Sequence, residues 1–253
     1  MSTTPIDPVA SQLVNARQQA QPVAGAAGPI NDTAHAYAIQ QAVAEAMGWP
    51  YASARHWKSG GANPDALQTH APLPEPGVRS SPADLRDMPF QLRCIEVEIA
   101  LRLGVAVDAK TADALDVNSA ADLIDAMCVS IEVVDTRWSE GLQAPDLAKL
   151  ADLQAHGALV LGQWVDWQAR DWSAQRCEVT IGSSPVQTFQ GTHSLGGPPA
   201  VLPKWLRHAC ALNGTVAAGT VVTTGTWCGL LHAQAGDQVQ ASFEGIGQAS
   251  LQF

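Results

Sequence analysis

Residues 94 to 103 constrain the fold more than any other segment, because two kinds of side chain alternate there. Ile95, Val97 and Ile99 occupy one set of alternating positions, and Glu96 and Glu98 occupy the positions between them. Side chains of a β-strand point alternately to its two faces, so this pattern predicts a strand with one aliphatic and one acidic face. Such a strand requires a sheet whose aliphatic face is buried against another layer.

The rest of the chain predicts helices first and strands later. Asp7-Pro8 indicates a helix to about Ala20, and residues 34–47 predict a second helix that Gly48 ends. Shorter helices are expected at 119–127 and at 198–212, where Pro203 requires either a late start or a kink. Strands are expected at residues 94–103, 128–135, 158–165, 176–181, 186–189, 220–224, 238–244 and 248–253. This order predicts an α+β protein with a mixed, curled β-sheet.

Residues 49–89 are rich in Pro, Gly, Ser and Ala and show no sustained period. Loops of this length are uncommon in compact domains and are often functional, so we expect a lid or a segment that lines a site. We therefore expect residues 1–89 to form an N-terminal helical and loop segment and residues 90–253 to form a β-rich core. Both parts are expected to belong to one structural domain.

Composition excludes several classes of function. The formal charge of −10 disfavours a nucleic-acid partner, which needs clustered Lys and Arg. No apolar run is long enough for a membrane helix, and residues 1–21 lack the features of a secretory signal. The five cysteines are scattered and never form a C-x-x-C pair, which indicates a reducing compartment, the cytoplasm.

Glu96 and Glu98 should point to the same side of their strand, where their charges repel. A divalent cation such as Mg²⁺ or Mn²⁺ would relieve that repulsion, although a solvated acidic face is the better interpretation of this spacing alone. Glu132 lies in a β-branched run, where an unpaired carboxylate is costly to bury. It indicates either a third metal ligand on an adjacent strand or a salt bridge to Arg137 or Arg102.

Lys58 precedes two glycines, Gly60 and Gly61, that allow close approach of the backbone. A lysine in such a loop can neutralise a substrate carboxylate or act as an acid or base when it is partly desolvated. A surface lysine before a turn is the alternative. The spacing of a phosphate-binding P-loop is absent.

Several motifs occur here in an order that resembles one known family. The sequence is similar to the 2-keto-4-pentenoate hydratase branch of the fumarylacetoacetate hydrolase superfamily, which also includes 2-oxohept-3-ene-1,7-dioate hydratase and 4-oxalocrotonate decarboxylase. The resemblance covers roughly residues 34–253, and its motifs lie at residues 36–41, 57–58, 95–100, 131–137, 218–226, 235–237 and 243–247.

The resemblance implies a β-roll core, homo-oligomers, a Mg²⁺ or Mn²⁺ ion and a small 2-oxo acid substrate. It implies that Glu96, Glu98 and Glu132 bind the metal and that Lys58 is the charged group beside the substrate. The turn formed by Thr223, Thr224, Gly225 and Thr226 is implied to line the substrate pocket. The family's proton-transfer acid is matched by Glu75 or by His70, or by neither.

The activity that the resemblance implies is hydration of a 2-hydroxydienoate in the catabolism of aromatic or related compounds. Decarboxylation of a 2-oxo acid would use the same metal site, so it stays open, and hydrolysis of a carbon–carbon bond is less well supported. Two departures favour a fourth alternative, a non-catalytic member. Lys58-Ser59-Gly60-Gly61 replaces the usual run after the lysine, and residues 151–157 replace a run with an expected amide.

Overall fold

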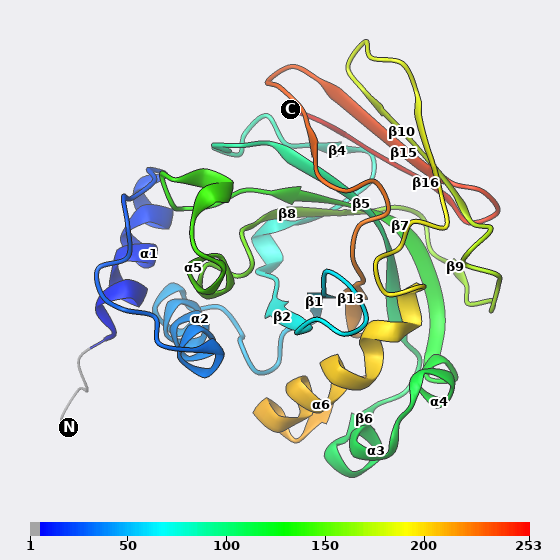
Figure 1. Ribbon diagram of the computed structural model, residues 1–253, viewed down its shortest axis with the longest axis horizontal. Coiled ribbons are helices and arrows are strands. Elements are labelled where there is room, and N and C mark those ends of the chain that lie inside the picture. The colour runs from blue at the N-terminus through cyan, green and yellow to red at the C-terminus, as the bar shows by residue number, and fades with distance from the viewer. Residues whose placement is uncertain (1–5) are drawn as a thin grey trace.

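Helices cover one flank of a sheet in the computed structural model, which describes residues 6–253 (Figure 1). The N-terminal helices α1 (Pro8–Gln19) and α2 (Thr33–Met47) pack together, and α2 also packs on α5 (Asp146–Ala151). The Asp7 carboxylate begins α1 by accepting the backbone N–H groups of Val9 and Ala10, at 2.8 and 3.2 Å. The left-handed backbone of Gly48 ends α2, as the sequence predicts.

The main sheet contains both parallel and antiparallel pairs. Within residues 6–253 its nine strands run in the order β2-β1-β13-β5-β7-β8-β3, with β14 paired to β5 and β9 paired to β7. Its strands are β1 (His56–Gly60), β2 (Thr69–Pro72), β3 (Val78–Ser80), β5 (Cys94–Leu103), β7 (Ile124–Val134), β8 (His156–Leu161), β9 (Val165–Asp166), β13 (Val221–Thr223) and β14 (Leu231–His232). The pairs β1–β13 and β3–β8 are parallel.

A second sheet lies across the main one, and its strands run in the order β11-β10-β15-β16-β4 (Figure 1). It consists of β4 (Ala83–Asp84), β10 (Arg176–Ile181), β11 (Gln187–Gln190), β15 (Gln238–Phe243) and β16 (Gly247–Gln252). The aliphatic face of β5, with Ile95, Val97 and Ile99, is buried in the core that the two sheets share. The acidic face of β5 is therefore directed to the opposite side of the main sheet.

The remaining elements are short, apart from α6 (Leu202–Asn213), which contributes Trp205 to the core beside Trp57 of β1. These short elements are α3 (Ala109–Ala114), α4 (Val117–Ala121), β6 (Val107–Asp108), β12 (Thr215–Val216), η1 (Glu75–Gly77), η2 (Gly141–Gln143) and η3 (Pro198–Val201). No helix within residues 6–253 is long and apolar enough to cross a membrane.

The predicted α+β class with a mixed, curled sheet is confirmed, whereas two local predictions are wrong. The helix expected at 119–127 stops at Ala121, because residues from Ile124 onward pair with β5 as part of β7. Residues 49–89 are not a plain loop, since they contain β1 to β4, whose two to five residues are too few to show a period. The helix expected at 198–212 starts late, with Pro203 in its first turn.

Strands from both sides of residue 89 share the two sheets. β1 and β2 pair within the main sheet, and β4 pairs with β16 in the second. We therefore propose that the two expected segments, 1–89 and 90–253, form one structural domain.

Candidate metal centre

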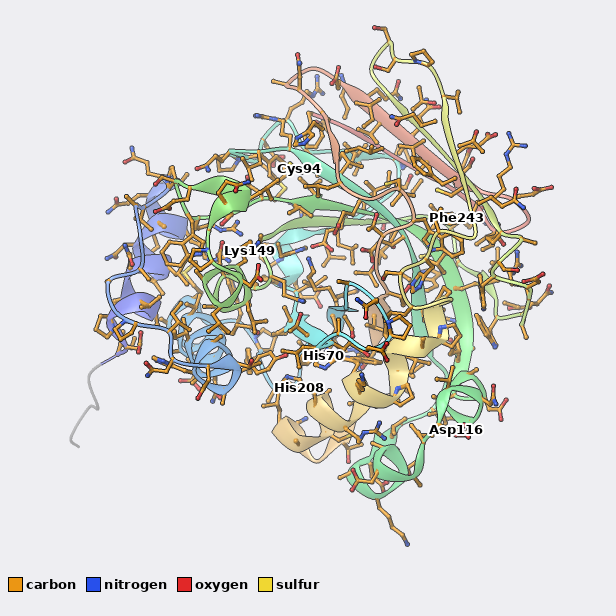
Figure 2. The ribbon with its side chains drawn as sticks, viewed as in Figure 1. His70, Cys94, Asp116, Lys149, His208 and Phe243 are labelled. Carbon is orange, nitrogen blue, oxygen red and sulfur yellow. The ribbon has the colours of Figure 1, made fainter. Side chains whose placement is uncertain are left out.

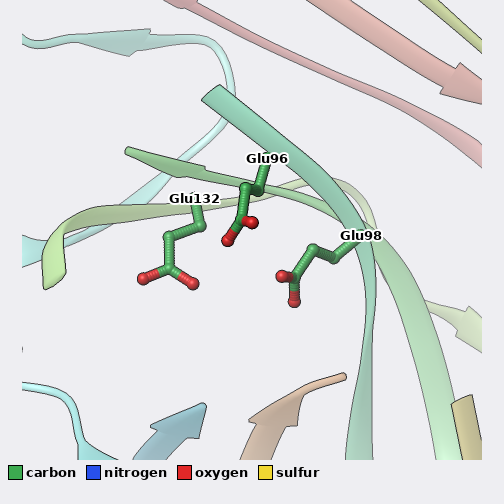
Figure 3. Close-up of side chains that lie close together, drawn as sticks. All are labelled: Glu96, Glu98 and Glu132. Carbon is green, nitrogen blue, oxygen red and sulfur yellow. The ribbon is translucent and has the colours of Figure 1, made fainter. Parts of the chain in front are cut away.

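Three glutamates converge on the concave side of the main sheet, where β5 and β7 run side by side (Figure 3). Glu96 pairs directly with Glu132 across the two strands, and Glu98 lies one step along the same face. Each of the three offers a carboxylate oxygen that lies within 4.8 Å of the other two. Glu98 and Glu132 are buried, and Glu96 is half-buried.

This arrangement places like charges where water cannot separate them. Burial raises the pKa of Glu96 to about 8, against the opposing effect of Lys58 and with further repulsion from the other two carboxylates. Burial and repulsion by Glu132 raise the pKa of Glu98 to about 7. A like-charged pair directly across two strands destabilises a sheet. The cluster therefore needs positive charge to be stable in its ionised form.

Lys58 supplies part of that charge from β1. Its Nζ donates to Glu132 Oε1 at 2.5 Å and to the backbone carbonyl of Gln154 at 3.2 Å. Burial would lower the pKa of Lys58, but the carboxylates of Glu132, Glu96 and Glu98 together raise it. One ammonium facing three carboxylates leaves two negative charges in excess when all of them are ionised.

The arginine partners considered for Glu132 are bound elsewhere. Arg102 pairs with Asp125 at 2.8 Å, and Arg137 pairs with Asp152 at 2.9 Å. The salt bridge of Glu132 is instead made by Lys58 of β1, which belongs to the same sheet and is separated from β5 by β13 alone.

His156 also contacts Glu132, a contact that the sequence analysis did not predict. Its Nδ1 lies 3.1 Å from Glu132 Oε1, and its Nε2 is buried with no hydrogen-bond partner among residues 6–253. Burial lowers the pKa of His156 despite the neighbouring carboxylate, so we assign the neutral ring with Nδ1–H donating to Glu132. The histidine begins β8, next to β7, and the sequence contains no metal-ligand spacing that marks it.

Residues 153–155 form a turn whose backbone lies in the left-handed helical region. Leu153, Gln154 and Ala155 have φ values of 53°, 55° and 55°, a conformation that costs a non-glycine residue roughly 1–2 kcal/mol. The turn directs the carbonyl of Gln154 at Lys58, and the Gln154 side-chain amide donates to the Thr69 hydroxyl. The altered run at residues 151–157 thus forms part of the wall around Lys58.

Four residues of the turn after β13 were predicted to line the substrate pocket, and two of them, Thr223 and Gly225, contact Glu98. The Thr223 hydroxyl donates to Glu98 Oε2, and the Gly225 N–H donates to the same oxygen at 2.9 Å. Gly225 has a φ of +104°, which few residues other than glycine adopt. The hydroxyls of Thr224 and Thr226 donate instead to backbone carbonyls, at 2.7 and 2.8 Å.

A sequence profile of the fumarylacetoacetate (FAA) hydrolase C-terminal family matches residues 66–253, which is most of the chain. The chain belongs to this family. It is 29% identical over 163 residues to a 2-hydroxyhexa-2,4-dienoate hydratase of Comamonas testosteroni. That match covers 62% of this chain and 59% of the relative, so the chain matches less than two thirds of the relative's length.

Solved structures with low sequence identity share the fold. The 4-oxalocrotonate decarboxylase from Pseudomonas putida G7, complexed with magnesium and adipate, has a TM-score of 0.80 at 16% identity, with all of both chains covered. The 2-hydroxyhepta-2,4-diene-1,7-dioate isomerase from Mycobacterium marinum has a TM-score of 0.58 at 16% identity, over 80% of this chain and 75% of that one. These similarities and the profile confirm the predicted family and fold.

The two residues suggested for the family's proton-transfer acid lie away from the three glutamates. Strand alternation directs His70 to the face of β2 opposite Lys58, where its Nδ1 lies 2.9 Å from Ser59 Oγ and its ring lies 4.9 Å from that of His208 (Figure 2). Glu75 lies in η1 with 52% of its side chain exposed, and its Oε1 is 3.0 Å from His56 Nδ1. Neither residue makes a hydrogen bond or an ion pair with Lys58 or with the three glutamates.

The donor set of the cluster fits a hard divalent cation. Mg²⁺ and Mn²⁺ prefer oxygen ligands, and the cluster offers three carboxylates from two adjacent strands. The buried Oε2 of Glu132 has no hydrogen-bond partner within residues 6–253, although an unpaired carboxylate oxygen is costly to bury. A bound cation would satisfy that oxygen and balance the two excess negative charges.

Proposed function

We propose that this chain is a metal-dependent hydratase that acts on a 2-hydroxydienoate or the corresponding unsaturated 2-oxo acid. The observation that carries this proposal is the group of three convergent carboxylates, beside one buried lysine that pairs with Glu132. The similarity to a 2-hydroxyhexa-2,4-dienoate hydratase supports the choice of reaction.

Glu96, Glu98 and Glu132 would hold Mg²⁺ or Mn²⁺. When bound, the ion supplies Lewis-acid polarisation of the carboxylate and 2-oxo end of the substrate. Thr223 and Gly225 donate hydrogen bonds that orient the Glu98 carboxylate, and His156 does the same for Glu132. These donors fix the ligands before the substrate arrives.

We assign proton transfer to Lys58 in place of Glu75 or His70. Lys58 lines a cavity of about 480 Å³ that Glu96 also lines. The surrounding carboxylates raise the pKa of Lys58, so Nζ is held as an ammonium as long as they bind no cation. Once their charge is neutralised by a bound cation, Nζ would release a proton to the far carbon of a dienolate. Glu132 Oε1, 2.5 Å away, stabilises the ammonium and can share its proton.

One observation favours a non-catalytic protein as the second candidate. Both groups that matched the family's acid lie outside the cluster, and Lys58 is held by two hydrogen bonds. A protein of this kind would bind the cation and a 2-oxo acid without converting it.

The test is to strip the purified protein of metal, restore Mg²⁺ and follow the ultraviolet absorbance of 2-hydroxyhexa-2,4-dienoate. A metal-dependent decay with hydrated product supports the hydratase, and CO₂ release from 2-oxohex-3-enedioate in its place identifies a decarboxylase. Glu98→Gln should abolish both metal binding and turnover, whereas Glu244→Gln, the same change at an exposed turn, should alter neither. Unchanged metal content in Glu98→Gln refutes the assignment of the ligands.

A further inference from the structure

The cavity beside the carboxylate cluster has two chemically different ends. Lys58 and Glu96 form its reacting end, and Thr69 and Gln154 lie near Lys58. The cavity holds about 480 Å³, which is more than the reacting end of a 2-oxo acid fills. The rest of its wall therefore contacts the tail of the substrate.

That remaining wall is mostly aliphatic and comes from separate parts of the chain. It includes Val134 at the end of β7, Leu142 of η2, Leu147 and Leu150 of α5, and Leu230 before β14. Leu67, from the connection between β1 and β2, adds a further leucine and is 67% exposed. No arginine lines the cavity within residues 6–253.

Both lysines that line the cavity already have carboxylate partners. Lys58 Nζ is bound to Glu132, and Lys149 Nζ lies 2.9 Å from Asp146 Oδ1 on α5. The side chain of Asp146 is 97% exposed, so the pair with Lys149 lies at the mouth, in contact with water. A second carboxylate on the substrate would meet leucines along the wall and no unpaired cation.

We infer that the physiological substrate is a 2-oxo or 2-hydroxydienoic monocarboxylate with an uncharged hydrocarbon tail, and not a dicarboxylate. This inference rests on the proposed function, because the proposed metal site determines that the 2-oxo acid end of the substrate lies at the glutamates and the tail lies at the opposite end of the cavity. A carboxylate loses its hydration on entering an aliphatic wall, whereas each buried methylene group gains affinity.

The experiment measures binding by calorimetry, with the intact chain loaded with Mg²⁺ and two stable 2-oxo acids of equal length. We expect 2-oxohexanoate to bind at least about 100-fold more tightly than 2-oxohexanedioate, a difference of about 2.7 kcal/mol. Along the series 2-oxobutanoate, 2-oxopentanoate and 2-oxohexanoate, each methylene should increase affinity about threefold to fourfold, as burial of a CH₂ group predicts.

Two pairs of variants test the wall directly. Leu67→Arg places a cation beside the tail at an exposed position that tolerates change, and it should tighten binding of the dicarboxylate at least tenfold. Leu67→Gln, of similar size but uncharged, should not. Lys149→Gln should leave the preference between the two acids unchanged, because we expect no tail carboxylate to reach Lys149.

The possible outcomes separate this inference from the function on which it rests. The inference is overturned if the dicarboxylate binds as tightly as the monocarboxylate or more tightly, or if Lys149→Gln weakens binding of the dicarboxylate alone. Neither result contradicts the proposed hydratase function. A preference for the monocarboxylate without turnover of 2-hydroxyhexa-2,4-dienoate refutes the hydratase alone. Failure of both acids to bind in the presence of Mg²⁺ refutes the proposed function and the inference together.

Discussion

The stability of the metal-free protein should fall as pH rises through neutrality, and Glu96→Gln should reduce that decline to the part that Glu98 contributes. The fold raises the pKa of Glu96 from 4.5 to about 8. Between these two values the folded protein holds a proton that the unfolded chain has released. The free energy of unfolding therefore decreases with pH in this window, and the contribution of the protonated Glu96 is lost by about pH 8.

The size of the effect follows from the shift. Each pKa unit corresponds to about 1.36 kcal/mol, so Glu96 contributes at most about 5 kcal/mol between about pH 4.5 and about pH 8. Buried histidines act in the opposite direction at lower pH. Burial lowers the pKa of His70 to about 3 and that of His193 to about 4, so they favour the folded state increasingly up to about pH 6.5.

The assay is chemical denaturation in a chelator at several pH values, for the wild type and for Glu96→Gln. The difference between the two proteins cancels the histidine contributions and should change by up to about 1.4 kcal/mol per pH unit. With Mg²⁺ at about 100 times the Kd that it has at neutral pH, the wild type should gain about 2.7 kcal/mol there, and at the same Mg²⁺ concentration the gain should grow with pH because the cation competes with protons. Parallel pH profiles of the two proteins without metal would refute the electrostatic account of the cluster.

Three further substitutions test the groups around the cluster. Asp152→Asn removes the buried carboxylate that joins two arginines and should lower the free energy of unfolding by about 3–5 kcal/mol in urea melts; a loss below about 1 kcal/mol contradicts this. His156→Leu should weaken Mg²⁺ binding about 10–100-fold by calorimetry, and His156→Asn, which keeps a donor near Nδ1, should weaken it less. Thr223→Val removes the hydroxyl that binds Glu98 and should cost about 1–3 kcal/mol at about pH 8, where Thr226→Val, as the control, costs little; equal losses would show that the bond is unimportant.

Sequence alone could predict the glutamates and their strands, because strand alternation is a local property. The alternating run at residues 94–103 fixes which side chains share a face, and the structure has that run as β5. The order of helices and strands was also sufficient for the fold class. Lys58 could be singled out only by its glycines and by the resemblance to the family.

The contacts that surround the glutamates depend on pairings between distant segments, which no local pattern contains. His156 reaches Glu132 because β8 lies beside β7, and Lys58 reaches it because β13 joins β1 to β5 in the same sheet. The end of α4 and the start of β7 were misplaced for the same reason, since pairing with β5 outweighs the helical preference of residues 122–127. The side to which His70 points could not be known until β2 was recognised as a strand.

The position of β1 in the sheet determines when Lys58 can reach the glutamates during synthesis of the chain. Glu96 and Glu132 pair directly across two strands and both precede residue 135, so the ribosome has released both well before the end of synthesis. β1, which carries Lys58, is held in the main sheet by β13, whose residues 221–223 are synthesised near the end of the chain. β5 and β7 can thus pair well before β1 and Lys58 are held beside β13. A nascent chain that stops short of residue 221 therefore has the repulsion between the glutamates without the ammonium that relieves it.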